Sequence, residues 1–271
     1  MRCPFLRSTL LAKFVSLAAL AVLGSMPVRA ESPAPTGATI APATERRTYI
    51  ALEVFMPEGN EVIYTGGELI VESPDGTVTK KTFYQSPGKP PVQREEIVYR
   101  LPSINIVKYR YENDESGELV EMNSTDGSNL AIRHRESKDA KIVEKNYKWG
   151  SSSAFGKTLV RMMASNWKTL VTDKKMMKVQ LLVPSRGESF AFKVELVRKL
   201  IKGHEGSTIV QMEPDSWLVR QFVPLMKFYF SGTPPQVYEF LGPSPVDSGK
   251  LKGKAMRVTF KFTDPPASMP I

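Results

Sequence analysis

Short runs of alternating apolar and polar residues, separated by turn residues, cover most of the chain from Arg46 onward and constrain its fold more than any other feature. Alternation with a period of two is typical of β-strands that bury one face. Clear examples are the runs at residues 177–183, 190–196 and 256–262. Because the connections between runs are short, neighbouring strands are expected to pair antiparallel. The sequence therefore predicts a mainly β protein, an antiparallel meander that curls into a barrel or half-barrel.

One segment, over about residues 154–172, departs from this alternation and has the period of an α-helix. Its large apolar residues recur at intervals of four, four, four and three, which places them on one helix face. These residues are Phe155, Leu159, Met163, Trp167 and Leu170. Its basic residues, Lys157, Arg161 and Lys168, are expected on the other faces. A helix this short is marginal alone in water, so we expect its apolar face to lie against the curved sheet.

Residues 1–30 have the features of a cleaved signal peptide: basic residues near the start, a short apolar run, and small residues before the cleavage position. Residues 31–45 are rich in Pro, Ala and Thr and are expected to form a disordered tether. We predict one β-rich domain over residues 46–264, with a division near residue 150 as the alternative, and a tail over residues 265–271. The protein is therefore expected in the periplasm or outside the cell, with no transmembrane segment after cleavage.

Composition narrows the chemistry of the mature chain. The only cysteine, Cys3, lies in the signal segment, so after cleavage disulfides, cysteine catalysis and cysteine metal sites are excluded. The formal net charge is +9, and the signal segment holds four basic and no acidic residues, which leaves +5. No nucleic-acid recognition motif accompanies this mild charge. We therefore expect no nucleic-acid partner.

The motifs that resemble catalytic or metal sites are weak. His134 and His204 share no ligand spacing, and Gly156-Lys157-Thr158 lacks the upstream glycine of a phosphate-binding loop. Glu213 and Asp215 flank a proline and form the best candidate for an acid/base pair. We predict no catalytic residue, no metal site, no cofactor and no enzymatic activity.

A group of methionine and aromatic residues surrounds the helical segment and the strands that follow it. Methionine fills irregular apolar space and adapts to varied ligands. The group forms either an ordinary core or the wall of a site for lipid or another apolar ligand. The candidate ligand-binding residues are Met162, Met163, Trp167, Phe190, Phe192, Phe228 and Phe230.

Over about residues 155–245, the order of several short motifs resembles that of a family of secreted bacterial proteins of unknown function. The motifs are Asn166-Trp167-x-x-Leu170, Val183-Pro184-Ser185-Arg186, Phe190-x-Phe192, Met212-Glu213-Pro214-x-Ser216-Trp217, Pro224-Leu225-x-x-Phe228-x-Phe230 and Tyr238-x-x-x-Gly242. The resemblance implies an exported, mostly antiparallel protein and implies no activity. A looser likeness, at the level of fold, is to the half-barrels that carry lipoproteins across the periplasm.

Two functional hypotheses follow. In the first, the protein is an exported envelope protein that binds an apolar or amphipathic envelope molecule such as lipid. In the second, it is a structural or protein-interaction component of the envelope with no small ligand, because exposed strand edges recruit partner strands. A hydrolase-type enzyme is a distant third.

Overall fold

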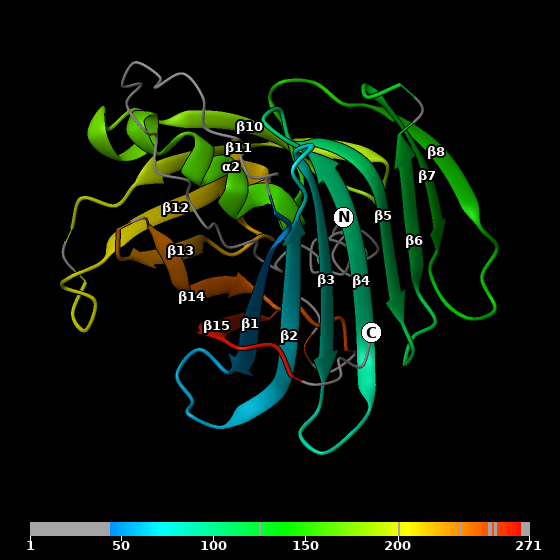
Figure 1. Ribbon diagram of the computed structural model, residues 1–271, viewed down its shortest axis with the longest axis horizontal. Helices are drawn as coiled ribbons and strands as arrows, with labels where there is room; N and C mark the ends of the chain where they lie inside the picture. Colours follow the sequence, from blue (N-terminus) through cyan, green and yellow to red (C-terminus); the bar gives the residue numbers. More distant parts are fainter. Residues whose placement is uncertain are drawn as a thin grey trace, which may run out of the picture.

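The computed structural model is one strongly curved β-sheet with helical segments at one end (Figure 1). It describes residues 44–124, 126–199, 201–233, 235–248, 251 and 254–266. The predicted signal peptide, most of the predicted tether and most of the predicted tail lie outside the described residues. Across the part of the chain that is described, no helix is long and apolar enough to cross a membrane.

Fifteen strands form the sheet. They are β1 (Arg46–Phe55), β2 (Val62–Glu72), β3 (Thr77–Gln85), β4 (Pro91–Arg100), β5 (Asn105–Asn113), β6 (Leu119–Ser124), β7 (Asn129–Arg135), β8 (Val143–Lys148), β9 (Ser153–Ala154), β10 (Met177–Val183), β11 (Glu188–Leu196), β12 (Thr208–Pro214), β13 (Met226–Ser231), β14 (Gln236–Pro243) and β15 (Ala255–Thr263). Their order is β8 to β1, then β15 down to β9, so two meanders join where β1 pairs with β15. Every pairing is antiparallel except that of β9 with β10. The predicted antiparallel meander is confirmed.

Local sequence accounts for the strands and their turns. In β15, Met256, Val258 and Phe260 are buried and alternate with half-buried residues, as a sheet with one face on the core requires. The β2–β3 turn is closed by a hydrogen bond from the Gly76 amide to the Ser73 carbonyl at 3.0 Å. Gly76 has φ 81°, a left-handed conformation that glycine adopts without steric cost.

The sheet curls until its two edge strands approach each other. In Figure 1, β2–β5 stand nearly upright whereas β10–β13 run across the view. Near the edges, the Tyr147 and Ser153 hydroxyls are 3.2 Å apart, and the Lys145 ammonium donates to the Arg186 carbonyl in the β10–β11 turn. No strand pairing joins β8 to β9 or β10 among the described residues, so the sheet is barrel-like and not closed. This confirms the predicted half-barrel.

Strands from both sides of residue 150 belong to this one sheet. The single domain predicted over residues 46–264 stays a prediction, and so does its alternative, a division near residue 150. Both concern which parts of the chain fold as a unit.

The predicted helix over residues 154–172 is present, with two changes. It consists of a 3-10 turn η1 (Gly156–Thr158), the α-helix α2 (Leu159–Ser165) and a π-helical turn η2 (Lys168–Thr172). The helix changes type near Asn166, where the side-chain amide donates to the Met162 carbonyl at 2.9 Å and the backbone amide donates to the same carbonyl at 3.1 Å. A further short helix, α3 (Trp217–Arg220), follows β12.

The second change concerns the faces of this helix. Phe155, Leu159, Met163 and Leu170 are buried as predicted, and Trp167 is half-buried and packs against the core. Lys157, expected on a face away from these apolar residues, is buried as well, because its side chain is only 2% exposed. The start of the helical segment lies inside the curled sheet and meets protein on several sides, whereas Lys168 further along the segment is exposed.

Candidate functional site

The seven predicted ligand-binding residues belong to one continuous apolar core. Met163, Phe192, Phe228 and Phe230 are at most 1% exposed and act as core packing. The other three, Met162, Trp167 and Phe190, are partly buried and pack against this core. The Trp167 and Phe230 rings meet edge to face, with centroids 5.0 Å apart. The sequence therefore identified residues that lie in one core, and their role in binding a ligand stays a prediction.

A cluster of buried charges lies around Lys157, at the start of the helical segment. No site was predicted there. The Lys157 ammonium contacts Glu95 Oε1 on β4 at 2.5 Å. On β3, the Lys80 ammonium lies 3.3 Å from Glu68 Oε2 of β2 and donates to the Lys157 carbonyl at 2.7 Å. All four side chains are at most 3% exposed. One ion pair, Lys157 with Glu95, and one hydrogen bond, from Lys80 to the Lys157 carbonyl, thus fasten η1 to the inner wall of β2–β4.

Glu95 is the centre of the polar contacts around this cluster. Its Oε2 atom accepts a hydrogen bond from the Tyr109 hydroxyl at 2.8 Å, and its Oε1 atom accepts one from the Gln93 amide at 2.8 Å. The Gln93 amide also donates to the Pro245 carbonyl at 2.8 Å. The connection between β14 and β15 is therefore tied to the same wall, with Val246 completely buried.

The other acid of the cluster, Glu68, is less well satisfied. Its Oε1 atom and the Tyr84 hydroxyl are buried with no hydrogen-bond partner among the described residues. Burial raises the pKa of Glu68 and raises the pKa of Tyr84 well above its ordinary value. Burial also lowers the pKa of Lys80 to about 8, although the carboxylate of Glu68 acts in the opposite direction. Transfer of these groups from water is costly, so the cluster makes stability depend on pH.

We expect the protein to gain stability as the pH rises from about 7.5 to about 9.5. The ordinary lysine pKa is 10.5, so between about 8 and 10.5 the unfolded chain binds more protons at Lys80 than the folded chain does. Deprotonation then favours the folded state, by about 2 kcal/mol at pH 9.5. Urea unfolding at the two pH values measures this gain. The gain should vanish in Lys80→Met, and an equal gain in that variant would contradict the assignment to Lys80.

The two histidines have separate structural partners. His134 Nε2 lies 2.9 Å from a carboxylate oxygen of Glu118, and His204 Nδ1 lies 2.8 Å from the Tyr238 hydroxyl. His134 belongs to β7, whereas His204 precedes β12. Within the described ranges, no group of three or more His, Cys, Asp or Glu side chains is arranged to hold a metal ion.

The carboxylates of the candidate acid/base pair are engaged in surface ion pairs. Glu213 lies 3.4 Å from Arg220. Asp215 contacts Lys178 at 3.0 Å and Lys193 at 2.8 Å, and hydrogen bonds from these lysines lower the pKa of its carboxyl. An ionised, half-buried carboxylate between two cations is suited to a structural role.

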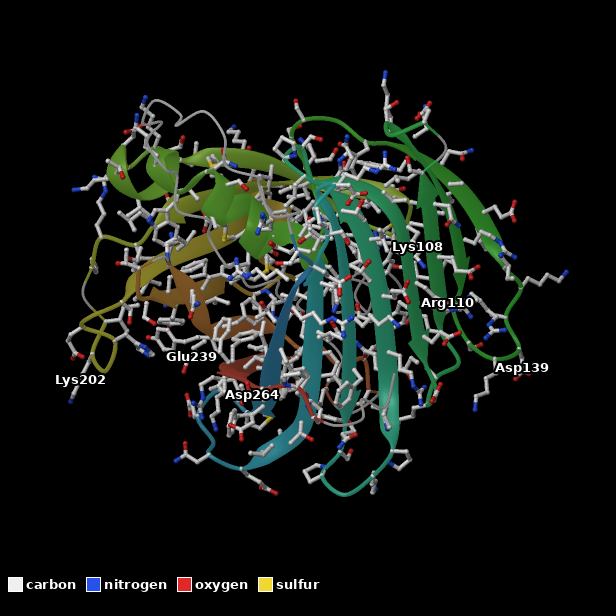
Figure 2. All side chains as sticks on the ribbon, in the orientation of Figure 1. Lys108, Arg110, Asp139, Lys202, Glu239 and Asp264 are labelled. Carbon is white, nitrogen blue, oxygen red and sulfur yellow. The ribbon has the colours of Figure 1, made fainter. Side chains whose placement is uncertain are left out.

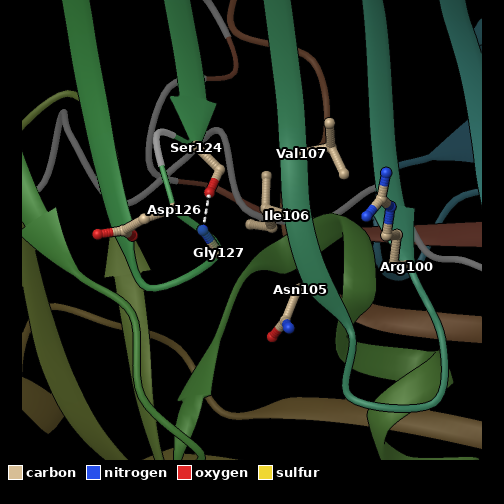
Figure 3. Close-up of a pocket in the computed structure, with 7 residues that line it drawn as sticks. All are labelled: Arg100, Asn105, Ile106, Val107, Ser124, Asp126 and Gly127. Carbon is tan, nitrogen blue, oxygen red and sulfur yellow. Dashed lines mark hydrogen bonds between the residues drawn. The ribbon is translucent and has the colours of Figure 1, made fainter.

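A shallow pocket of about 220 Å³ lies between the β4–β5 turn and the turn after β6 (Figure 3). Within it, the Gly127 amide donates to the Ser124 hydroxyl at 2.8 Å. Asp126 accepts hydrogen bonds from Ser128 and Asn129, which lower the pKa of its carboxyl to about 2. These contacts organise the turn, and they leave the pocket without a group suited to acid/base chemistry.

Comparison with solved structures gives a distant likeness. No family model matches the chain, and no curated protein matches it significantly. A solved β-barrel-like protein of a domain of unknown function, DUF1849, from Brucella abortus is 11% identical, with a TM-score of 0.37. The match covers 80% of this chain and 97% of that chain. At this identity and score, no function or site residue transfers to the present chain.

Proposed function

We propose that the protein is exported to the cell envelope and binds an amphipathic, lipid-like molecule where its apolar core reaches the surface. One observation carries this proposal. Within a single apolar group, four residues are completely buried while Met162, Trp167 and Phe190 are only partly buried. A large aromatic or methionine side chain that keeps contact with both core and solvent offers an apolar ligand a surface to cover.

The chemistry of the surrounding residues favours an amphipathic ligand over a purely apolar one. Lys168 is exposed on η2, next to Trp167, and two exposed lysines, Lys174 and Lys175, follow η2. Methionine and tryptophan therefore adjoin cations at this end of the helix. The signal-like segment over residues 1–30 supports the proposed export to a compartment that lipids border on both sides.

The test compares two tryptophans. Trp167→Ser should weaken binding of a phospholipid with a pyrene-labelled acyl chain at least tenfold, because it removes the half-buried ring from the ligand surface. Trp217→Ser is the matched control, since Trp217 is 71% exposed on α3 and lies outside the apolar group. Circular dichroism establishes that both variants are folded. Met162→Ser is a second variant with the same expected direction. Unchanged binding in folded Trp167→Ser and Met162→Ser would refute the proposal.

A second candidate function is a protein-interaction component of the envelope, and one observation favours it. Among the described strands, β8 pairs with β7 alone, and most of its residues are exposed. Ile142 and Val143, at its start, are 42% and 49% exposed. An exposed edge strand can accept a strand from a partner protein. Lys145 already covers part of this edge by its contact with the β10–β11 turn, so lipid binding remains the stronger proposal.

A further inference from the structure

A second surface pocket, with a volume of about 410 Å³, lies at the rim of the sheet beyond the helical segment. Three parts of the chain line it: the residues between η2 and β10, the residues at and just after the end of β11, and Gln211 of β12. The first segment contributes Lys174 and the second contributes Arg198 and Lys199. The fold therefore gathers three cations around one hollow.

The positive charge of this pocket is only partly balanced. No described acidic side chain forms an ion pair with Lys174, Arg198 or Lys199. The one acid in the lining, Glu195, accepts a hydrogen bond from the Gln211 amide at 2.7 Å. Like charges gathered at a concave surface repel one another and attract an anion.

The outer face of β4–β8 shows a different arrangement. Figure 2 marks Lys108 and Arg110 on β5. Lys108 contacts Glu96 at 2.5 Å, and Arg110 contacts Glu121 at 2.5 Å. Arg133 shares the same Glu121 at 2.8 Å. Cross-strand acids neutralise the cations on that face, whereas the one acid that lines the rim pocket, Glu195, forms no ion pair with Lys174, Arg198 or Lys199 among the described residues.

Apolar side chains share the pocket with the cations. Met176 is 45% exposed, and Leu196 and Val197 are half-buried. The Lys175 amide donates to the Thr169 carbonyl of η2 at 2.9 Å, which joins this wall to the helical turn that follows Trp167. A molecule held here meets cations and apolar surface together, which is the requirement of an anionic amphiphile.

We propose that the rim pocket binds the anionic head group of a phosphate-bearing amphiphile, with its acyl part on Met176, Leu196 and Val197. The inference deepens the proposed function and rests on it. Arginine presents a planar fork that matches phosphate oxygens, and lysine supplies compact charges that complete the neutralisation. The volume of the pocket is within the range that accommodates small ligands and head groups.

The test uses vesicles of the anionic phosphatidylglycerol and of the zwitterionic phosphatidylcholine, with binding measured by flotation. The pocket variant is Lys174→Gln/Arg198→Gln/Lys199→Gln. The control variant, Lys89→Gln/Lys141→Gln/Lys148→Gln, removes the same charge from exposed lysines elsewhere. Wild type and control should bind phosphatidylglycerol at least tenfold more tightly than phosphatidylcholine. The pocket variant should lose that preference while its circular dichroism spectrum is unchanged.

Each other outcome decides a different claim. Equal loss in the pocket and control variants means general charge attraction and overturns the inference. If the wild type binds both kinds of vesicle and the pocket variant binds them equally well, the inference is overturned while the proposed function stands. Absence of vesicle binding by the wild type overturns the proposed function. If inorganic phosphate binds the wild type as tightly as the vesicles do, the site is assigned to soluble phosphate. That result would overturn the inference that the ligand is a lipid.

Discussion

Replacing Lys157 with methionine is expected to lower the free energy of unfolding by about 3–5 kcal/mol, because it leaves the carboxylate of Glu95 buried without its cation. The contact between the two charges is 2.5 Å long, and both side chains are at most 3% exposed. Methionine has a similar length, so the loss comes mainly from the unpaired charge. Urea unfolding followed by tryptophan fluorescence measures the change.

Two further variants separate the charge effect from the effect of altering the helix. Lys168→Met changes an exposed lysine of the same helical segment and should alter stability by less than about 0.5 kcal/mol. Lys157→Met combined with Glu95→Gln removes both charges and should recover part of the loss. A loss in Lys157→Met no greater than in Lys168→Met would contradict the buried ion pair.

Replacing Phe155 with alanine is expected to cost about 3–5 kcal/mol of folding free energy, because a large buried ring leaves a cavity. Phe155 is 1% exposed and precedes η1, where the helical segment enters the sheet. Its ring meets the Tyr109 ring of β5 edge to face, with centroids 4.7 Å apart. The variant therefore loses both apolar burial and an aromatic pair. Thermal unfolding and urea unfolding both measure the change.

Leu218→Ala is the comparison for this prediction. Leu218 is 53% exposed on α3, so its truncation should change stability by less than about 0.5 kcal/mol. Similar small effects of both substitutions would mean that the helical segment lies on the outside of the sheet. That result would contradict the packing of Phe155 against β5.

Sequence patterns predicted the strands and the helix because their signals are local. Alternation in β15 and the glycine turn between β2 and β3 each act within a few residues. The spacing of Phe155, Leu159 and Met163 likewise identifies a helix face without knowledge of its partner. The change of helix type near Asn166 was not predicted, because the apolar spacing continues across it from Met163 to Trp167 and Leu170.

The buried charges were missed because their partners come from distant parts of the chain. Helical spacing assigned Lys157 to a polar face, and solvent is the default neighbour of such a face. One signal existed: Glu68, Lys80 and Glu95 are charged residues at core-facing positions of three neighbouring strands. Opposite charges at such positions indicate an ionic cluster. Their interaction with the helical segment follows only from the curl of the sheet.

Alternation also cannot distinguish a filled interior from a hollow one, since both bury one face of every strand. Met163 and Phe228 are completely buried, whereas Trp167 keeps some exposure, and their role in binding a ligand stays a prediction. The rim pocket was not predicted from the sequence because it forms only when Lys174 and Arg198 are brought together.

Native mass spectrometry of residues 31–271, produced with the signal segment and purified without detergent, tests the central claim most directly. If the protein binds lipid, the spectrum should show a reproducible mass above that of the chain. Solvent extraction should then identify the added mass as a phosphate-bearing lipid. A bare chain mass, with no uptake of added phospholipid, would contradict the claim and favour a role through protein partners at β8.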